Sequence, residues 1–276
     1  MAKRTSSTVA IWLIIFAVLW YFRTPGAVAV IVGVSVLTLR EFYKLMAAAG
    51  NAPFERLGML FGGLITLAPW AESRLTLPSY PLVALATIVF SIRMLSERTP
   101  EKRVEALAST LFGLVYVSLM LQYLVRIATP LAGDAILPDG RLVLCLWVVA
   151  VAKFCDVGAL LAGMAIGRHA MAPAISPKKT WEGAAGGIAV AMGVGALVAW
   201  LGRSVLPPAI SPLRAALLAA PLAAVAIVSD LVESVIKRRA ALKDSGGGIP
   251  GIGGIFDLSD SLILAAPVGY FLLGMA

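Results

Sequence analysis

Apolar stretches of about twenty residues follow one another along almost the whole chain, and no other feature limits the fold as strongly. In a bilayer every backbone N–H and C=O group must be hydrogen bonded within the protein, and a helix achieves this within one segment. Of the 276 residues, 60% are hydrophobic and only 14% are charged, a composition outside the usual range of soluble domains. The sequence therefore predicts an all-α integral membrane protein, a polytopic bundle of helices.

Proline, glycine and charge clusters divide the apolar sequence into about nine candidate transmembrane helices, with seven to ten as the range. We expect them at residues 8–22, 27–46, 57–71, 80–95, 105–127, 142–166, 183–202, 213–236 and 256–275. The first could be a signal peptide, but another apolar span follows it directly, so we interpret it as a transmembrane helix. Residues 1–130 form a predicted N-terminal region with about five helices, and residues 140–276 form a C-terminal region with two polar loops.

The distribution of basic residues predicts how the helices are oriented. With nine helices, sixteen of the 23 Lys and Arg residues fall in one alternating set of connections and six in the other, while Lys153 lies inside a helix. Lys and Arg collect in the cytoplasmic connections of membrane proteins. We therefore expect a cytoplasmic N-terminus, an external C-terminus, and both polar loops on the cytoplasmic side.

The net charge of +8 does not by itself indicate nucleic-acid binding. Cytoplasmic loops gather positive charge and face anionic lipid head groups, so we expect the lipid bilayer, and no nucleic acid, as a partner. Cys145 and Cys155 lack the spacing of a metal site and are interpreted as buried apolar side chains. The oligomeric state is left open, with a homodimer as one alternative.

Charged residues concentrate between residues 229 and 260 of this otherwise apolar sequence. An Asp or Lys at mid-helix depth costs about 2.5–3.5 kcal/mol on insertion scales, so such residues indicate a functional site. Spacings of i, i+3, i+4 and i+7 place four polar residues on one helix face: Asp230, Glu233, Ser234 and Lys237. The alternative is a self-neutralising polar stripe at a cytoplasmic helix end.

Two further aspartates, Asp257 and Asp260, stand three residues apart where the last predicted helix begins. The helix dipole explains one acidic residue there without any ligand. Two of them facing Asp230 would repel one another, and the usual remedies are a raised carboxylate pKa or a divalent cation. Oxygen ligands together with phosphate favour Mg²⁺. The preceding glycine-rich tract, which includes Gly253 and Gly254, can bring backbone N–H groups to an anion. These residues therefore predict a magnesium and phosphate site.

The second polar loop, residues 167–183, also contains groups suited to phosphate. Ser176 offers a hydroxyl, while Lys178 and Lys179 offer point charges. The tendency of lysines to collect at the cytoplasmic side is an alternative explanation for them. The hydroxyl of Thr180 also suits phosphate, and the alternative is that Thr180 caps the start of the following helix.

Three other features have simpler interpretations. Inside the sixth predicted helix, Asp156 has Lys153 one turn earlier as a partner. His169, the only histidine, is interpreted as a lipid head-group contact rather than a catalytic base. Small residues allow helices to approach closely in lipid, and we assign this packing role to Gly183, Gly186 and Gly187.

The polar residues resemble the signature of the phosphatidate cytidylyltransferase family, integral membrane enzymes that make CDP-diacylglycerol. That signature runs Ser, two residues, Lys-Arg, four residues, Lys-Asp, a Gly/Pro-rich tract, Gly-Gly and a closing Asp-x-x-Asp. The chain matches it in order and spacing at Ser234, Lys237, Arg238, Lys243, Asp244, Pro250, Gly253, Gly254, Asp257 and Asp260. The run ISPKKTWEG, residues 175–183, resembles the second family marker, and Asp156 matches the acidic residue before it.

The resemblance implies transfer of the cytidylyl group of CTP to phosphatidate, in a multi-pass protein of the inner (plasma) membrane with its active site facing the cytoplasm. It makes residues 140–276 the catalytic region. The implied catalytic residues are Asp230, Lys237, Arg238, Asp257 and Asp260, with Mg²⁺ held by the three aspartates. The implied substrate-binding residues are Ser176, Lys178, Lys179, Ser234, Lys243, Asp244, Gly253 and Gly254.

Four positions depart from the family pattern. Ile252 stands in place of a His, Leu258 in place of an Arg, Ser229 in place of a Gly, and Leu160 in place of an aromatic residue. An impaired, non-catalytic homologue is therefore one alternative. A CTP-dependent kinase acting on polyprenol or phytol-like alcohols is another, and it would release CDP instead of pyrophosphate. The third is a membrane transporter, which would place its charges near mid-membrane and in many folds contains inverted repeats.

Overall fold

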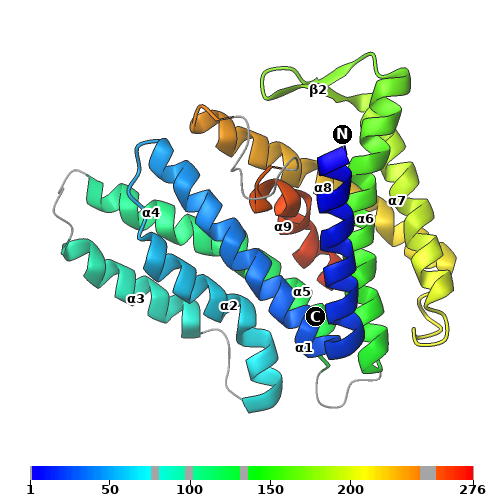
Figure 1. The fold of residues 1–276 in the computed structure, drawn as a ribbon, viewed down its shortest axis with the longest axis horizontal. Helices are drawn as coiled ribbons and strands as arrows, with labels where there is room; N and C mark the ends of the chain where they lie inside the picture. Colours follow the sequence, from blue (N-terminus) through cyan, green and yellow to red (C-terminus); the bar gives the residue numbers. More distant parts are fainter. Residues whose placement is uncertain (1, 76–80, 97–101, 131–135, 243–252, 276) are drawn as a thin grey trace. The chain divides into compact units, whose positions relative to one another are not determined.

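The computed structural model describes residues 2–75, 81–96, 102–130, 136–242 and 253–275, with side chains from residue 17 onward (Figure 1). Its helices are α1 (Ala2–Ala48), α2 (Glu55–Leu75), α3 (Pro81–Leu95), α4 (Arg103–Gly113), the π-helix η2 (Leu114–Leu119), α5 (Met120–Ala128), α6 (Pro138–Ile166), α7 (Trp181–Leu201), α8 (Pro212–Arg239) and α9 (Ile255–Leu272). Two strands, β1 (Ala170–Ala172) and β2 (Ser176–Thr180), form an antiparallel hairpin. The predicted all-α class is confirmed, with this hairpin as a local exception.

Several helices are long and apolar enough to cross a membrane. Within the described residues there are six: Ala17–Ala48, Arg103–Ala128, Pro138–Ile166, Trp181–Leu201, Pro212–Arg239 and Ile255–Leu272. The helix Pro81–Leu95 is apolar but shorter. The structure thus supports a polytopic membrane protein, while the count of nine spans and the cytoplasmic N-terminus stay predictions.

The first two predicted helices, 8–22 and 27–46, join in α1. This helix is interrupted at Arg23, whose φ of 47° and ψ of −128° are not helical. A positive φ is uncommon for a residue other than glycine, and Pro25 supplies no backbone N–H to the helix. The interruption therefore falls at the predicted boundary between the two segments.

The chain divides into two compact units, and the boundaries between them fall inside α5, α8 and α9. The first unit comprises residues 1–125 and 236–259, and the second comprises residues 126–235 and 260–276. The assignment of catalysis to residues 140–276 stays a prediction.

Aromatic rings and small polar side chains form the core of the first unit. Phe42 is fully buried, and its ring centroid lies 5.8 Å from that of Tyr43 and 6.1 Å from that of Phe256. Hydroxyl groups join the helices: Thr38 Oγ1 lies 2.7 Å from Ser259 Oγ. Such hydrogen bonds and close packing hold helices together where the surrounding lipid is as apolar as the side chains. In this way α1 packs against the start of α9.

Glycines bring α6 and α7 close together in the second unit. A Cβ atom on Gly187 would lie 2.7 Å from the carbonyl oxygen of Cys155, and one on Gly183 would lie 2.9 Å from that of Ala159. Real Cβ atoms do not approach other atoms so closely, so only glycine fits without a shift. The packing role predicted for these glycines is confirmed, and the hairpin lies at one end of the α6 and α7 pair (Figure 1).

The hairpin leads directly into α7. Its strands pair with Ala170 opposite Thr180 and Ala172 opposite Ser176. Thr180 is the N-cap of α7, since its Oγ1 accepts a hydrogen bond of 3.1 Å from the backbone N–H of Gly183. The alternative of a helix cap at Thr180 is therefore confirmed.

Candidate active site

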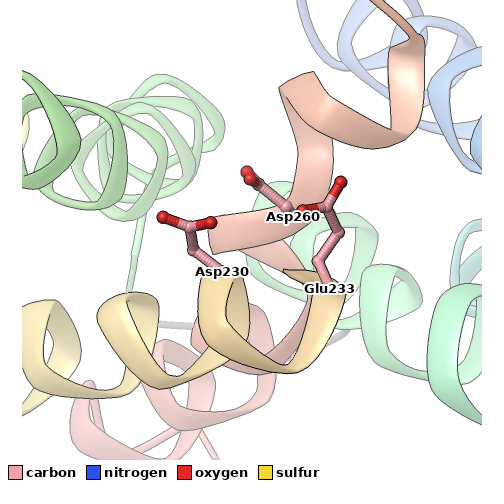
Figure 2. Close-up of side chains that lie close together, drawn as sticks. All are labelled: Asp230, Glu233 and Asp260. Carbon is pink, nitrogen blue, oxygen red and sulfur yellow. The ribbon is translucent and has the colours of Figure 1, made fainter. Parts of the chain in front are cut away.

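Three carboxylates from two helices converge in the second unit. Asp230 and Glu233 lie one turn apart on α8, and Asp260 faces them from α9 (Figure 2). One carboxylate oxygen from each lies within 4.8 Å of the others. Glu233 is fully buried and Asp260 is 9% exposed, so water screens their repulsion weakly. A cation held between them would relieve that repulsion.

The sequence predicted two members of this cluster and missed the third. Asp230 and Asp260, both expected metal ligands, lie together as predicted. Glu233 was placed on the same helix face as Asp230 but was not included among the site residues. Its i, i+3 spacing from Asp230 was the signal that could have identified it.

Lys179 connects the hairpin to this cluster. Its Nζ is enclosed by the protein and lies 2.5 Å from Asp230 Oδ2, and the two side chains are 23% and 25% exposed. Lys178, the preceding residue of β2, is exposed. Successive side chains of a strand point to opposite faces, which accounts for the different surroundings of the two lysines.

A pocket of about 240 Å³ opens beside the Lys179–Asp230 ion pair. Its polar lining comes from β2, α6 and α8, and its apolar lining comes mainly from α6 and α7. The lining residues are Asp156, Ala159, Leu160, Met171, Lys178, Lys179, Thr180, Gly183, Ala184, Ile227 and Asp230. This volume lies just below the range of about 300–1,000 Å³ that is usual for pockets of whole small-molecule ligands, and it leaves room for a phosphate group. Ser176, at the start of β2, is half-buried and lies outside this lining.

A network of ion pairs and hydrogen bonds holds Asp260, one member of the acidic cluster. Lys153 Nζ lies 3.5 Å from Asp156 Oδ2, which confirms the predicted pair. The same ammonium lies 3.3 Å from Asp260 Oδ1 and donates a hydrogen bond of 2.7 Å to Ser261 Oγ. Ser261 Oγ in turn donates to Asp156 Oδ2 at 2.9 Å. The contact between Lys153 and Asp260 joins residues 107 apart in the chain, and no sequence pattern indicated it.

Ser229, which departs from the family pattern, has a defined structural role. Its hydroxyl donates a hydrogen bond to the backbone oxygen of Asp260 and accepts one of 3.2 Å from the backbone N–H of Leu264. The hydroxyl therefore bridges the acceptor and the donor of one i→i−4 pair of α9. This bridge fixes the backbone of α9 against α8 at Asp260.

In the first unit, Asp257 forms a separate set of contacts at the start of α9. Its Oδ1 lies 2.8 Å from Lys237 Nζ, and its Oδ2 accepts a hydrogen bond of 2.8 Å from the backbone N–H of Gly254. Gly253 has a φ of 113°, and a Cβ there would lie 2.8 Å from Asp257 Oδ2. Both glycines thus shape the turn around Asp257, and the backbone N–H of Gly254 donates a hydrogen bond to its carboxylate. Glu41 Oε2 accepts a further hydrogen bond of 2.9 Å, from the backbone N–H of Phe256.

The other predicted site residues vary in their surroundings. Ser234 is half-buried on α8, and Arg238 is exposed near the end of that helix. Lys243 and Asp244, together with the departure at Ile252, lie outside the described residues. Leu160 lines the pocket and Leu258 is half-buried on α9.

Glu182 anchors the hairpin, a role that the sequence did not indicate. Its Oε2 accepts hydrogen bonds from the backbone N–H groups of Arg168 and His169, at 3.1 and 3.2 Å. Its Oε1 lies 2.5 Å from His169 Nδ1. These contacts fix the hairpin against the first turn of α7, which helps position Lys179.

Comparison with known proteins relates this sequence to a group of enzymes. A model described as "Cytidylyltransferase family" matches residues 2–276. The chain is 31% identical over 277 residues to a phosphatidate cytidylyltransferase of Synechocystis sp., an alignment that covers 91% of this chain and 88% of that protein. It is 33% identical over 198 residues to one from Rickettsia bellii, covering 71% of this chain and 81% of that protein. With one from Brucella suis it shares 41% identity over 124 residues, 45% and 44% of the two chains.

Proposed function

Because the chain belongs to the cytidylyltransferase family, we propose that it transfers the cytidylyl group of CTP to phosphatidate, giving CDP-diacylglycerol and pyrophosphate. The relatives from Synechocystis and Rickettsia bellii carry the name of this activity. The observation that carries the proposal is the convergence of three carboxylates with Lys179 beside a pocket that has room for a phosphate group. This arrangement suits a reaction in which every reacting group is a phosphate.

The reaction needs no nucleophilic side chain. An anionic oxygen of phosphatidate attacks the α-phosphorus of CTP, a new P–O bond forms, and the bond from that phosphorus to the bridging oxygen breaks. The electron pair of the broken bond leaves with pyrophosphate, and no proton has to be removed from the nucleophile. The protein must therefore align two phosphates and offset their charge.

The acidic cluster fits a divalent cation by its chemistry. Asp230, Glu233 and Asp260 offer only carboxylate oxygens, which are the ligands that Mg²⁺ accepts from proteins. We infer that these three residues hold Mg²⁺, which when bound would offset the negative charge of the CTP phosphates. The family signature adds Asp257 as a predicted ligand.

Lysine side chains offset the remaining phosphate charge. We assign Lys179, which lines the pocket, to binding a substrate phosphate. The exposed Lys178 attracts that phosphate as the substrate enters the pocket. By the family signature, Lys237 and Arg238 act on the pyrophosphate leaving group. The distribution of basic residues supports nine spans and a site that faces the cytoplasm, and the family resemblance implies the inner membrane.

The test is product formation by purified protein. Protein in detergent micelles is incubated with CTP labelled in the cytidine, phosphatidate and Mg²⁺, and both the lipid-linked cytidine and the released pyrophosphate are measured. We expect both products in equal amounts, with none when phosphatidate is omitted or when Asp230→Asn is used. Release of CDP with a phosphorylated alcohol would indicate the kinase alternative. A lack of any lipid-linked cytidine would refute the proposal.

A further inference from the structure

Lys153 is a cation placed inside a membrane-spanning helix, where it contacts two carboxylates. Its Nζ lies between Asp156 of its own helix and Asp260 of α9, at 3.5 and 3.3 Å. The Lys153 side chain is 23% exposed and that of Asp260 is 12% exposed. A lysine inside a membrane-spanning helix costs free energy, so its presence here needs a physical reason.

We propose that Lys153 acts as the fixed counter-cation of the acidic cluster. Through Asp260 it limits how negative the cluster becomes, and so it weakens metal binding while favouring anionic substrates. The inference rests on the proposed function, since it concerns the carboxylates assigned to Mg²⁺. Nothing in the family signature includes this residue.

Charge is the main contribution of Lys153, because other groups hold Asp260 in place. The backbone N–H of Ser261 donates to Asp260 Oδ1 at 2.6 Å, and Ser229 fixes the Asp260 backbone. Removal of the Lys153 ammonium therefore changes the local charge by one unit and leaves the Asp260 carboxylate held. A divalent ion several ångströms from the lost charge gains about fivefold or more in affinity, even with water-like screening.

The charge change has the opposite effect on substrates. CTP and phosphatidate are both anions, and a cluster with one more negative charge repels them. We therefore expect the KM for CTP to rise by about threefold or more while kcat changes less. If Lys153 only supported the fold, its replacement would instead lower the metal affinity and the stability together.

The test measures Mn²⁺ binding, a paramagnetic substitute for Mg²⁺, by electron paramagnetic resonance on purified protein without substrates. Lys153→Met should tighten Mn²⁺ binding about fivefold or more, whereas Lys153→Arg should stay within about twofold of the wild type. Arg214→Met is the matched control, because it removes a positive charge from α8 sixteen residues, or about 24 Å, from Asp230. It should leave the Mn²⁺ affinity unchanged.

A charge-compensating pair keeps the test decisive if Lys153→Met does not fold. Asp156→Asn removes the opposite charge and should weaken Mn²⁺ binding, and the double variant with Lys153→Met should return close to the wild-type affinity. Unchanged or weaker Mn²⁺ binding by folded Lys153→Met would overturn the inference, as would a wild type that binds no Mn²⁺. If the double variant departs from wild type by fivefold or more, the inference also fails. A wild type that binds Mn²⁺ but makes no CDP-diacylglycerol would refute the proposed function alone.

Discussion

Replacement of Lys179 by methionine tests the proposed phosphate pocket most directly. The change removes the ammonium and keeps a side chain of similar length, so the apolar lining of the pocket is preserved. In the structure this ammonium is enclosed and lies 2.5 Å from Asp230 Oδ2, with each side chain about three-quarters buried. The substitution therefore removes a partly buried cation beside the proposed metal ligand.

The expected loss follows from that burial. Loss of one partner costs about 1 kcal/mol or less for an exposed ion pair and about 3–5 kcal/mol for a fully buried one. The surroundings of Lys179 are intermediate, and we take its contact with a substrate phosphate to be worth as much as an ion pair of intermediate burial, about 2 kcal/mol of transition-state stabilisation. That corresponds to about a 30-fold fall in kcat/KM.

The adjacent lysine provides the control. Lys178 lines the same pocket but is exposed, so Lys178→Met should lower kcat/KM by only about twofold. Both variants and Lys179→Arg are assayed for CDP-diacylglycerol formation at several CTP and phosphatidate concentrations. If Lys179→Met stays within threefold of wild type, or if both lysines matter equally, the assignment of Lys179 to a substrate phosphate is wrong.

Three further substitutions test the site and its support. Glu233→Gln should raise the Mg²⁺ concentration for half-maximal activity about tenfold or more, because a charged ligand is lost. If the Mg²⁺ titration is unchanged from wild type, Glu233 is not a ligand of the proposed metal site. Gly187→Leu should lower the free energy of unfolding in detergent by about 1–3 kcal/mol, because the larger side chain overpacks the contact between α6 and α7. Gly193→Leu is the control on the same helix: the space around its Cβ position is open, so the free energy of unfolding should stay unchanged. Ser229→Ala should cost about 1–2 kcal/mol of stability through two lost hydrogen bonds, and thermal unfolding identical to wild type would contradict the bridge.

The local features of the fold were predictable because they depend on neighbouring residues. Apolar length gave the helices, Pro25 and Arg23 marked the interruption of α1, and one-turn spacing gave the Lys153–Asp156 pair. A packing role for the glycines of α7 also followed from composition, although their partner helix did not. Such features need only helix geometry and the chemistry of lipid.

Contacts between distant segments were not predictable in the same way. Lys153 and Asp260 meet only because α6 and α9 pack together, and nothing in either segment specifies that partner. The sequence predicted only a polar loop where β1 and β2 lie, since three and five residues give too short a pattern to identify as strands. Glu233 was visible on the correct helix face, but its membership in the acidic cluster depends on where α9 lies.

The hydroxyl bridge from Ser229 has a consequence for the order of assembly in the membrane. Before it meets α8, α9 can satisfy its backbone groups within its own turns, as an inserted helix must. The hydroxyl of Ser229 can reach the Asp260 carbonyl and the Leu264 N–H only after the two helices associate. The carboxylates of Asp230 and Asp260 likewise come from different helices. The proposed metal site should therefore form late in biogenesis, as a product of helix association rather than of insertion.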